Sequence, residues 1–149
     1  MGRGGSRVRA AEATVVLEAK TASILDYESF VDNLLFLTER DRCRLKLAGG
    51  EVFDNIVKHA APLCDGRLIA RAARRSGSAS ILLGFYFSSK SFDSVAAEAA
   101  GTDGAKPVFD PAHRRWRGMG MAMCRNLARR VSFRPGETMD RIYLEFDPA

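Results

Sequence analysis

The sequence predicts an α+β fold, a two-layer α/β sandwich in which helices cover one face of a mixed, mostly antiparallel sheet. Two observations predict it. The segments follow the order strand, helix, helix, two strands, long loop, helix and two strands, and no internal repeat is present. The 149 residues have the size of one domain. We expect this domain at residues 8–149, after a flexible basic tail at residues 1–7.

The first expected elements are a strand and an amphipathic helix. A cluster rich in β-branched residues at residues 14–17 predicts a strand between residues 8 and 20. Ser23 resembles a helix start, and the apolar residues after it recur at helical spacing. We therefore expect a first helix that ends near Thr38. Its apolar positions are Ile24, Tyr27, Phe30, Val31, Leu34 and Leu35.

A second helix is expected at residues 42–61. Asp41 is a suitable N-cap, and Pro62 prevents the helix from continuing. Gly49 and Gly50 lie inside this helix, where each glycine costs about 1 kcal/mol relative to alanine. Such a pair requires a local reason, either a close crossing by another element or a kink.

The middle of the chain predicts a β-hairpin and then a long connection. Residues 67–74 and 80–87 have the composition of strands, and Ser76-Gly77-Ser78 between them forms a turn. The second strand is almost entirely apolar, which places it centrally in the sheet. Residues 88–117 then form a connection with at most one short helix, near residues 95–100. Connections of this length are often lids or binding loops.

The last third of the chain predicts a helix and a closing hairpin. Gly118-Met119-Gly120 opens a helix whose apolar positions continue through Leu127 to Val131. Residues 131–134 and 141–146 then form two strands around a turn at Pro135-Gly136.

The composition restricts the classes of partner. The net charge is +5, from 23 Lys plus Arg against 18 Asp plus Glu, and the excess is mostly arginine. Arginine donates two parallel hydrogen bonds to phosphates and carboxylates, so nucleotides, nucleic acid and acidic protein surfaces all fit. No apolar run approaches the roughly 20 residues of a membrane span. The three cysteines are far apart without metal-ligand spacing, which indicates a reducing cytoplasm and three small buried side chains.

The second helix carries a polar row of three residues. Glu51, Asn55 and His59 are spaced four apart, so their side chains lie on one helical face beside the apolar face. On this stretch alone, three solvated residues on an ordinary surface helix are the preferred interpretation. A chemical interpretation gains weight from the glycine-rich helix start at Gly118 and Gly120, because unpaired N–H groups at a helix N-terminus bind phosphate.

The polar row and the glycine-rich helix start together suggest a chemical role for three residues. Asn55 offers a neutral oxygen ligand to a divalent ion that bridges phosphates. Glu51, one turn away, is placed to act as a general base. Arg117, adjacent to the helix start, is the best candidate for a further phosphate contact.

Taken together, the motifs resemble the histidine-kinase-like ATPase superfamily, and within it the bacterial anti-sigma factor and serine-protein kinase family. Residues 44–60, RLKLAGGEVFDNIVKHA, look like the family's asparagine box, and residues 118–123, GMGMAM, look like its second glycine box. The resemblance covers about residues 15–146.

The resemblance implies ATP and Mg²⁺ as cofactors. Asn55 would hold Mg²⁺, Glu51 would activate a protein serine, and His59 would lie near the phosphates, under a lid formed by the loop before Gly118. It also implies a sigma factor and a small STAS-type anti-anti-sigma protein as partners, with a homodimer as the default assembly. No membrane contact and no direct nucleic-acid contact are expected.

One box departs from the family pattern. Where the family has Asp-x-Gly at the end of the central strand, this chain has Ser88-Ser89-Lys90. By the resemblance, that Asp reads the adenine amino group, and Ser88 is a weaker neutral acceptor in its place. The alternative is therefore a module that kept the fold, lost the nucleotide and regulates a partner by contact alone. Nucleic-acid binding ranks last, because the sequence shows no helix-turn-helix and no interleaved aromatic platform.

Overall fold

The computed structural model describes residues 11–59, 66–75, 77, 79–88, 108–110, 115–117, 119–134 and 139–148. For residues 59, 108–110, 115–117 and 119–122 it describes the backbone alone. The expected basic tail at residues 1–7, the expected short helix near residues 95–100, Gly118 and the turn at Pro135-Gly136 lie outside the described residues.

The described part of the chain forms the α+β architecture that the sequence predicts. Five strands make one open sheet in the order β1-β2-β3-β7-β6, and every neighbouring pair is antiparallel. The central strand is β3, as its apolar composition predicts, and five of its seven residues are buried. The strands are β1 (Glu12–Glu18), β2 (Arg67–Arg74), β3 (Ile81–Phe87), β6 (Arg130–Arg134) and β7 (Asp140–Phe146).

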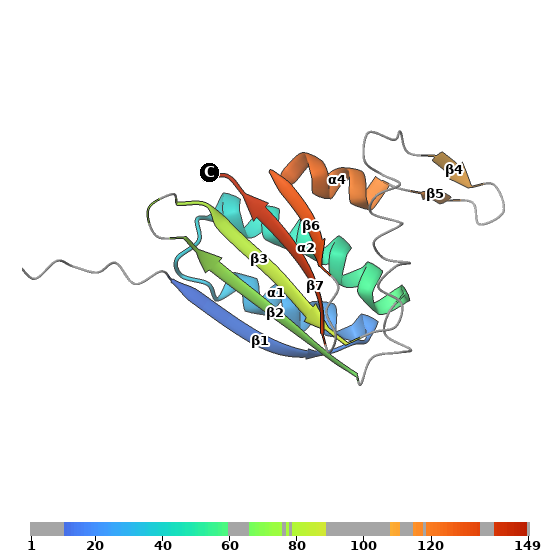
Figure 1. The fold of residues 1–149 in the computed structure, drawn as a ribbon, viewed down its shortest axis with the longest axis horizontal. Helices are drawn as coiled ribbons and strands as arrows, with labels where there is room; N and C mark the ends of the chain where they lie inside the picture. The colour runs from blue at the N-terminus through green and yellow to red at the C-terminus, as the bar shows by residue number, and fades with distance from the viewer. Residues whose placement is uncertain are drawn as a thin grey trace, which may run out of the picture.

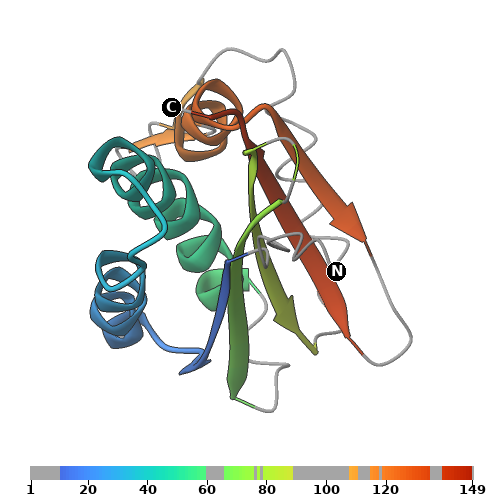
Figure 2. The ribbon, with the colours of Figure 1, turned by 90° about the vertical axis from the view of Figure 1, so that its left-hand side faces the viewer.

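The described helices form a second layer on one face of this sheet (Figures 1 and 2). They are α1 (Ile24–Asp32), preceded by the 3-10 turn Thr21–Ser23, α2 (Glu39–His59) and α4 (Met119–Leu127). α2 is the longest of them and packs against both α1 and α4. The core lies between the two layers; its largest completely buried side chains are Tyr27, Phe53, Phe85, Phe87 and Phe146.

The boundary between α1 and α2 differs from the predicted one. α1 ends at Asp32 rather than near Thr38. Leu34 and Leu37 are buried beyond its end, because the connecting turn packs them into the core without being helical. Apolar spacing alone does not distinguish such a packed turn from another turn of helix.

The start of α2 is a capping box, and Asp41 is not the N-cap that the sequence predicts. The Thr38 N–H donates to Asp41 Oδ2 at 3.2 Å, and the Asp41 N–H donates to Thr38 Oγ1 at 3.1 Å. Arg44 Nη2 also donates to Asp41 Oδ1 at 2.6 Å. Burial works to raise the pKa of Asp41, but the hydrogen bonds from Arg44 and Thr38 outweigh it and lower that pKa. Thr38 is therefore the capping residue, and Asp41 completes the motif from within the first turn.

Two further differences concern the end of the chain. The long connection contains a short two-stranded sheet, β4 (Val108–Asp110) paired with β5 (Arg115–Arg117), which the sequence analysis did not predict. α4 ends at Leu127, and Val131 belongs to β6, where it pairs with Leu144.

The expectation of buried cysteines is correct for Cys124 and wrong for Cys43, which is exposed; Cys64 lies outside the described residues. No described helix combines the length and apolar character that a membrane span requires.

Gly49 marks a close crossing of α1 over α2. A Cβ at Gly49 would overlap the hydroxyl of Tyr27, and it would lie 2.8 Å from Leu83 Cδ2. The Tyr27 hydroxyl donates to the Leu45 carbonyl at 2.6 Å, so the glycine makes room for a buried, hydrogen-bonded tyrosine. Gly50 is different, because a Cβ there would make only an ordinary 3.7 Å contact with Ile24. The predicted close crossing is confirmed at Gly49 alone.

We predict opposite effects of alanine at the two glycines. Gly49→Ala should destabilise the protein by about 2 kcal/mol or more, since overpacking must displace Tyr27 from its hydrogen bond. Gly50→Ala, its matched control, should stabilise the protein by roughly 0.5 to 1 kcal/mol through helix propensity. Urea denaturation of both variants measures the difference, and equal midpoints would contradict the crossing.

Candidate nucleotide site

The polar row of α2 lies at the border of the core. Val52, Phe53 and Ile56 are buried, as the amphipathic pattern predicts. Glu51 and Asn55 are half-buried, so neither is a fully solvated surface residue. His59 is the last residue of α2 and is described by its backbone alone.

α4 runs antiparallel to α2 and packs beside this row. The start of α2 lies near the end of β7, because Arg44 Nη2 donates to the Asp147 carbonyl at 2.7 Å. The end of α4 lies at the same place, because the Arg129 N–H donates to the Glu145 carbonyl at 2.7 Å. In between, Cys124 Sγ donates to the Ala48 carbonyl at 3.2 Å. The first turn of α4 therefore faces the later half of α2 (Figure 1).

The environment of Glu51 favours a proton acceptor. Burial raises the pKa of Glu51, the neighbouring carboxylate of Asp54 raises it further, and Lys58 partly opposes both. Lys58 is itself bound to Asp54, at 2.6 Å. The charge of Glu51 also acts on Cys124 of α4. Burial, as the larger cause, and the Glu51 charge together raise the pKa of this thiol to about 12, so it stays neutral. Glu51 is thus a carboxylate of raised basicity in the contact between α2 and α4.

The other candidate residues group around the same end of the molecule. Gly120 is the second residue of α4, so the predicted helix start is correct to within a residue. Arg117 is the last residue of β5, directly before that helix, and is described by its backbone alone. Gly118, between them, lies outside the described residues. Ser88 is exposed and follows the end of β3, the sheet end toward which α2 runs.

The sequence analysis missed Asp140. This residue begins β7 and pairs in register with Phe87, so it lies one position along from Ser88 on the neighbouring strand. Its side chain is only 4% exposed, which is unusual for a carboxylate. The signal that identifies it is the pairing of β3 with β7, which joins residues more than 50 positions apart.

Coordination of Mg²⁺ would depend on the side-chain oxygen of Asn55 and on oxygens of the bound phosphates. Among the described side chains, no group of three or more His, Cys, Asp or Glu residues is placed to hold a metal ion. The half-buried amide of Asn55 offers one neutral oxygen ligand to such an ion, and bound phosphates and water would have to supply the others. The residues present thus fit the phosphate and metal half of a nucleotide site.

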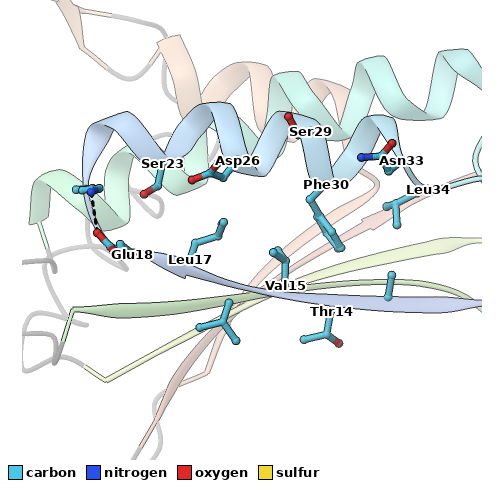
Figure 3. Close-up of a pocket in the computed structure, with 13 residues that line it drawn as sticks. Thr14, Val15, Leu17, Glu18, Ser23, Asp26, Ser29, Phe30, Asn33 and Leu34 are labelled. Atoms are coloured by element: carbon cyan, nitrogen blue, oxygen red, sulfur yellow. Dashed lines mark ion pairs between the residues drawn. The ribbon is translucent and has the colours of Figure 1, made fainter.

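A separate groove of about 700 Å³ lies between β1 and α1 (Figure 3). Val15, Leu17, Phe30 and Leu34 supply its apolar part, and the ion pair of Lys20 with Glu18, 2.7 Å long, lies at one end. None of the predicted site residues lines it. β1 is an edge strand of the described sheet, so its outer backbone groups face this side. The groove suits a peptide rather than the predicted phosphate chemistry.

No protein-family model matches the chain, and no curated protein matches it either.

We predict that Glu51→Gln stabilises the protein at neutral pH. Because the folded-state pKa is raised, the stability contributed by protonated Glu51 is complete below the ordinary pKa and is lost as pH rises through the folded-state pKa. At pH 7 the variant should raise Tm by about 2 °C, a value kept small because solvent screens the half-buried group. The gain should disappear below about pH 4.

Calorimetry from pH 4 to pH 8 tests this prediction. Glu39→Gln, an exposed glutamate in the first turn of the same helix, is the matched control and should give no gain. A loss of stability in Glu51→Gln at pH 7 would mean that the Glu51 carboxylate is held by a stabilising partner instead.

Proposed function

We propose that the protein is an anti-sigma-type regulator that binds ATP with Mg²⁺ and phosphorylates a small antagonist protein on serine. The observation that carries this proposal is Glu51: a half-buried carboxylate of raised pKa lies one helical turn from Asn55 and faces the antiparallel helix α4. Phosphoryl transfer requires a positioned base and neutralised phosphate charge, and this contact would supply both.

In the proposed reaction Glu51 accepts the proton of the attacking serine hydroxyl. The serine oxygen forms a bond to the γ-phosphorus, and the bond from that phosphorus to the bridging oxygen breaks, so that ADP leaves with the electron pair. Asn55 would hold Mg²⁺, which neutralises phosphate charge when bound. The N–H groups of the first turn of α4, including that of Gly120, face the same end and would bind the phosphates.

We further propose that Asp140 supplies the carboxylate missing at the end of β3. Ser88 stands where the family pattern has Asp, but β7 places a buried carboxylate beside Phe87, the residue before Ser88. A carboxylate accepts a hydrogen bond from an amino group more strongly than a hydroxyl does. Asp140, which lies on the same face of the sheet as Phe87, would thus accept the hydrogen bond from the adenine amino group.

A sigma factor and a STAS-type protein are the proposed partners, and a cytoplasmic location accompanies them. Support comes from the groove beside β1. Its edge strand and its apolar floor are suited to an extended segment of a partner protein.

The alternative function is a contact-only module, and the groove is also the observation that favours it. The groove beside β1 lies away from Glu51 and suits a peptide, and Ser88 weakens the adenine end of the nucleotide site. In that case the partner would bind along β1 and no nucleotide would be required.

We predict saturable, magnesium-dependent ATP binding in calorimetric titrations. Asn55→Ala should weaken binding in the presence of Mg²⁺ by at least tenfold and should remove most of the magnesium dependence, because the amide oxygen is lost. Asn33→Ala, an exposed asparagine beside the groove, is the matched control and should bind as the wild type does. Absence of binding up to millimolar ATP would favour the contact-only module.

We predict that Asp140→Asn weakens ATP more than GTP, and that Ser88→Asp tightens ATP by up to about tenfold. Both changes alter the carboxylate that would accept a hydrogen bond from the adenine amino group. Guanine has a carbonyl oxygen at that position and cannot donate this hydrogen bond. The nucleotide affinities of folded variants, verified by circular dichroism, measure the effect. Equal losses for ATP and GTP in Asp140→Asn would restrict Asp140 to a structural role.

We predict that the slow hydrolysis of ATP, with water in place of serine, depends on Glu51. Because the pKa of Glu51 is raised, activity should rise with pH through a limb above the ordinary glutamate pKa of about 4.3. Glu51→Gln should lower turnover by about 10² to 10⁴-fold and abolish this limb while ATP still binds. An unchanged limb in Glu51→Gln would assign the base to another group.

A further inference from the structure

The outer face of the sheet, opposite the helix layer, gathers residues from all five strands. No described element covers this face (Figure 2). The strand register aligns its side chains in three rows. They are Val16, Ile69, Tyr86, Arg141 and Arg134 in the first row, Thr14, Arg71, Gly84, Tyr143 and Ser132 in the second, and Glu12, Ala73, Leu82, Glu145 and Arg130 in the third.

Two tyrosines form the centre of this face. The rings of Tyr86 and Tyr143 lie edge to face, with centroids 5.8 Å apart and planes at 84°. Gly84 forms the floor beneath them, because a Cβ there would lie 3.0 Å from the Tyr86 ring and 3.2 Å from that of Tyr143. Both rings are partly exposed. The glycine therefore lets this edge-to-face pair pack closely against an otherwise open sheet.

Positive charge is concentrated beside the aromatic pair. Arg134 and Arg141 are directly opposite each other on β6 and β7, and both are exposed. Like charges in this arrangement destabilise a sheet unless an anion lies between them. The Arg134 guanidinium lies 5.8 Å from the centroid of the Tyr143 ring. Neither arginine forms an ion pair with a described acid, whereas Arg71 on the other side of the pair is bound to Glu12.

We propose that this face binds single-stranded nucleic acid. Exposed aromatic rings and guanidinium planes stack on bases, which are accessible only when unpaired, and the Arg134–Arg141 pair provides a site for backbone phosphate. From the sequence, nucleic-acid binding ranks last because the chain shows no helix-turn-helix and no interleaved aromatic platform. The fold creates one from Tyr86 and Tyr143, which lie 57 positions apart in the sequence.

Fluorescence anisotropy with a labelled 12-nucleotide uridine RNA and the matching thymidine DNA tests the proposal. The double variant Arg134→Gln, Arg141→Gln should weaken binding at least tenfold at low salt, and it should reduce the slope of log affinity against log salt by about 1.4 for two lost phosphate contacts. The control Arg40→Gln, Lys58→Gln removes the same charge from two exposed residues of α2, in the helix layer on the opposite side of the sheet, and should change affinity less than twofold.

A second pair of variants tests stacking. Tyr143→Leu should weaken binding by about fivefold or more, while Tyr143→Phe should keep it. Asn55→Ala should bind the RNA as the wild type does, so this result is independent of the proposed ATP site.

Three outcomes would overturn the proposal. The first is that no saturable binding occurs at low salt. The second is that the Arg134→Gln, Arg141→Gln variant and the control double variant lose affinity equally. The third is that a 12-base-pair duplex or polyglutamate competes as effectively as the single strand. Such equal competition would mean that the face binds any negatively charged polymer and does not recognise unpaired bases.

Discussion

The crossing of Tyr27 over Gly49 is the constraint on which the helix layer depends. One hydroxyl, donated to the Leu45 carbonyl, occupies the space that any side chain at position 49 would need. The Tyr27 ring also contacts Phe53, with centroids 6.2 Å apart, and Phe85 on the central strand, at 5.7 Å. A single residue of α1 thereby fixes the position of α2 relative to both α1 and the sheet, in the middle of the helix that carries the polar row.

The position of α2 determines what its polar row can contact. Once the middle of the helix is fixed, Ala48 accepts the Cys124 thiol and α4 lies antiparallel alongside. Glu51 then lies in the helix contact, where burial raises its pKa and the charged carboxylate costs stability at neutral pH. On a solvated surface the charged form of a glutamate would carry no such cost. Gly49 and the nearby Glu51 are thus parts of one arrangement.

Local patterns predicted most of the fold, and they failed where tertiary packing outweighs periodicity. The strand and helix segments followed from alternation, spacing and turn residues. The extension of α1 to Thr38 was wrong because Leu34 and Leu37 keep helical spacing within a packed turn. Val131 continued the α4 pattern but pairs with Leu144 in β6. For the site, the helical row of Glu51 and Asn55 was readable from spacing of four. The proximity of Asp140 to Ser88 and of Tyr143 to Tyr86 was not, because both depend on the long-range pairing of β3 with β7.

The central claim is that the later half of α2 and the first turn of α4 form one metal and phosphate site. Paramagnetic broadening of backbone amide signals by Mn²⁺ in the presence of ATP tests it most directly. The account predicts saturable broadening centred on Asn55 and Gly120, while the amides of Val16 and Glu39 remain sharp. Broadening that centres on the groove between β1 and α1, or that never saturates, would contradict it.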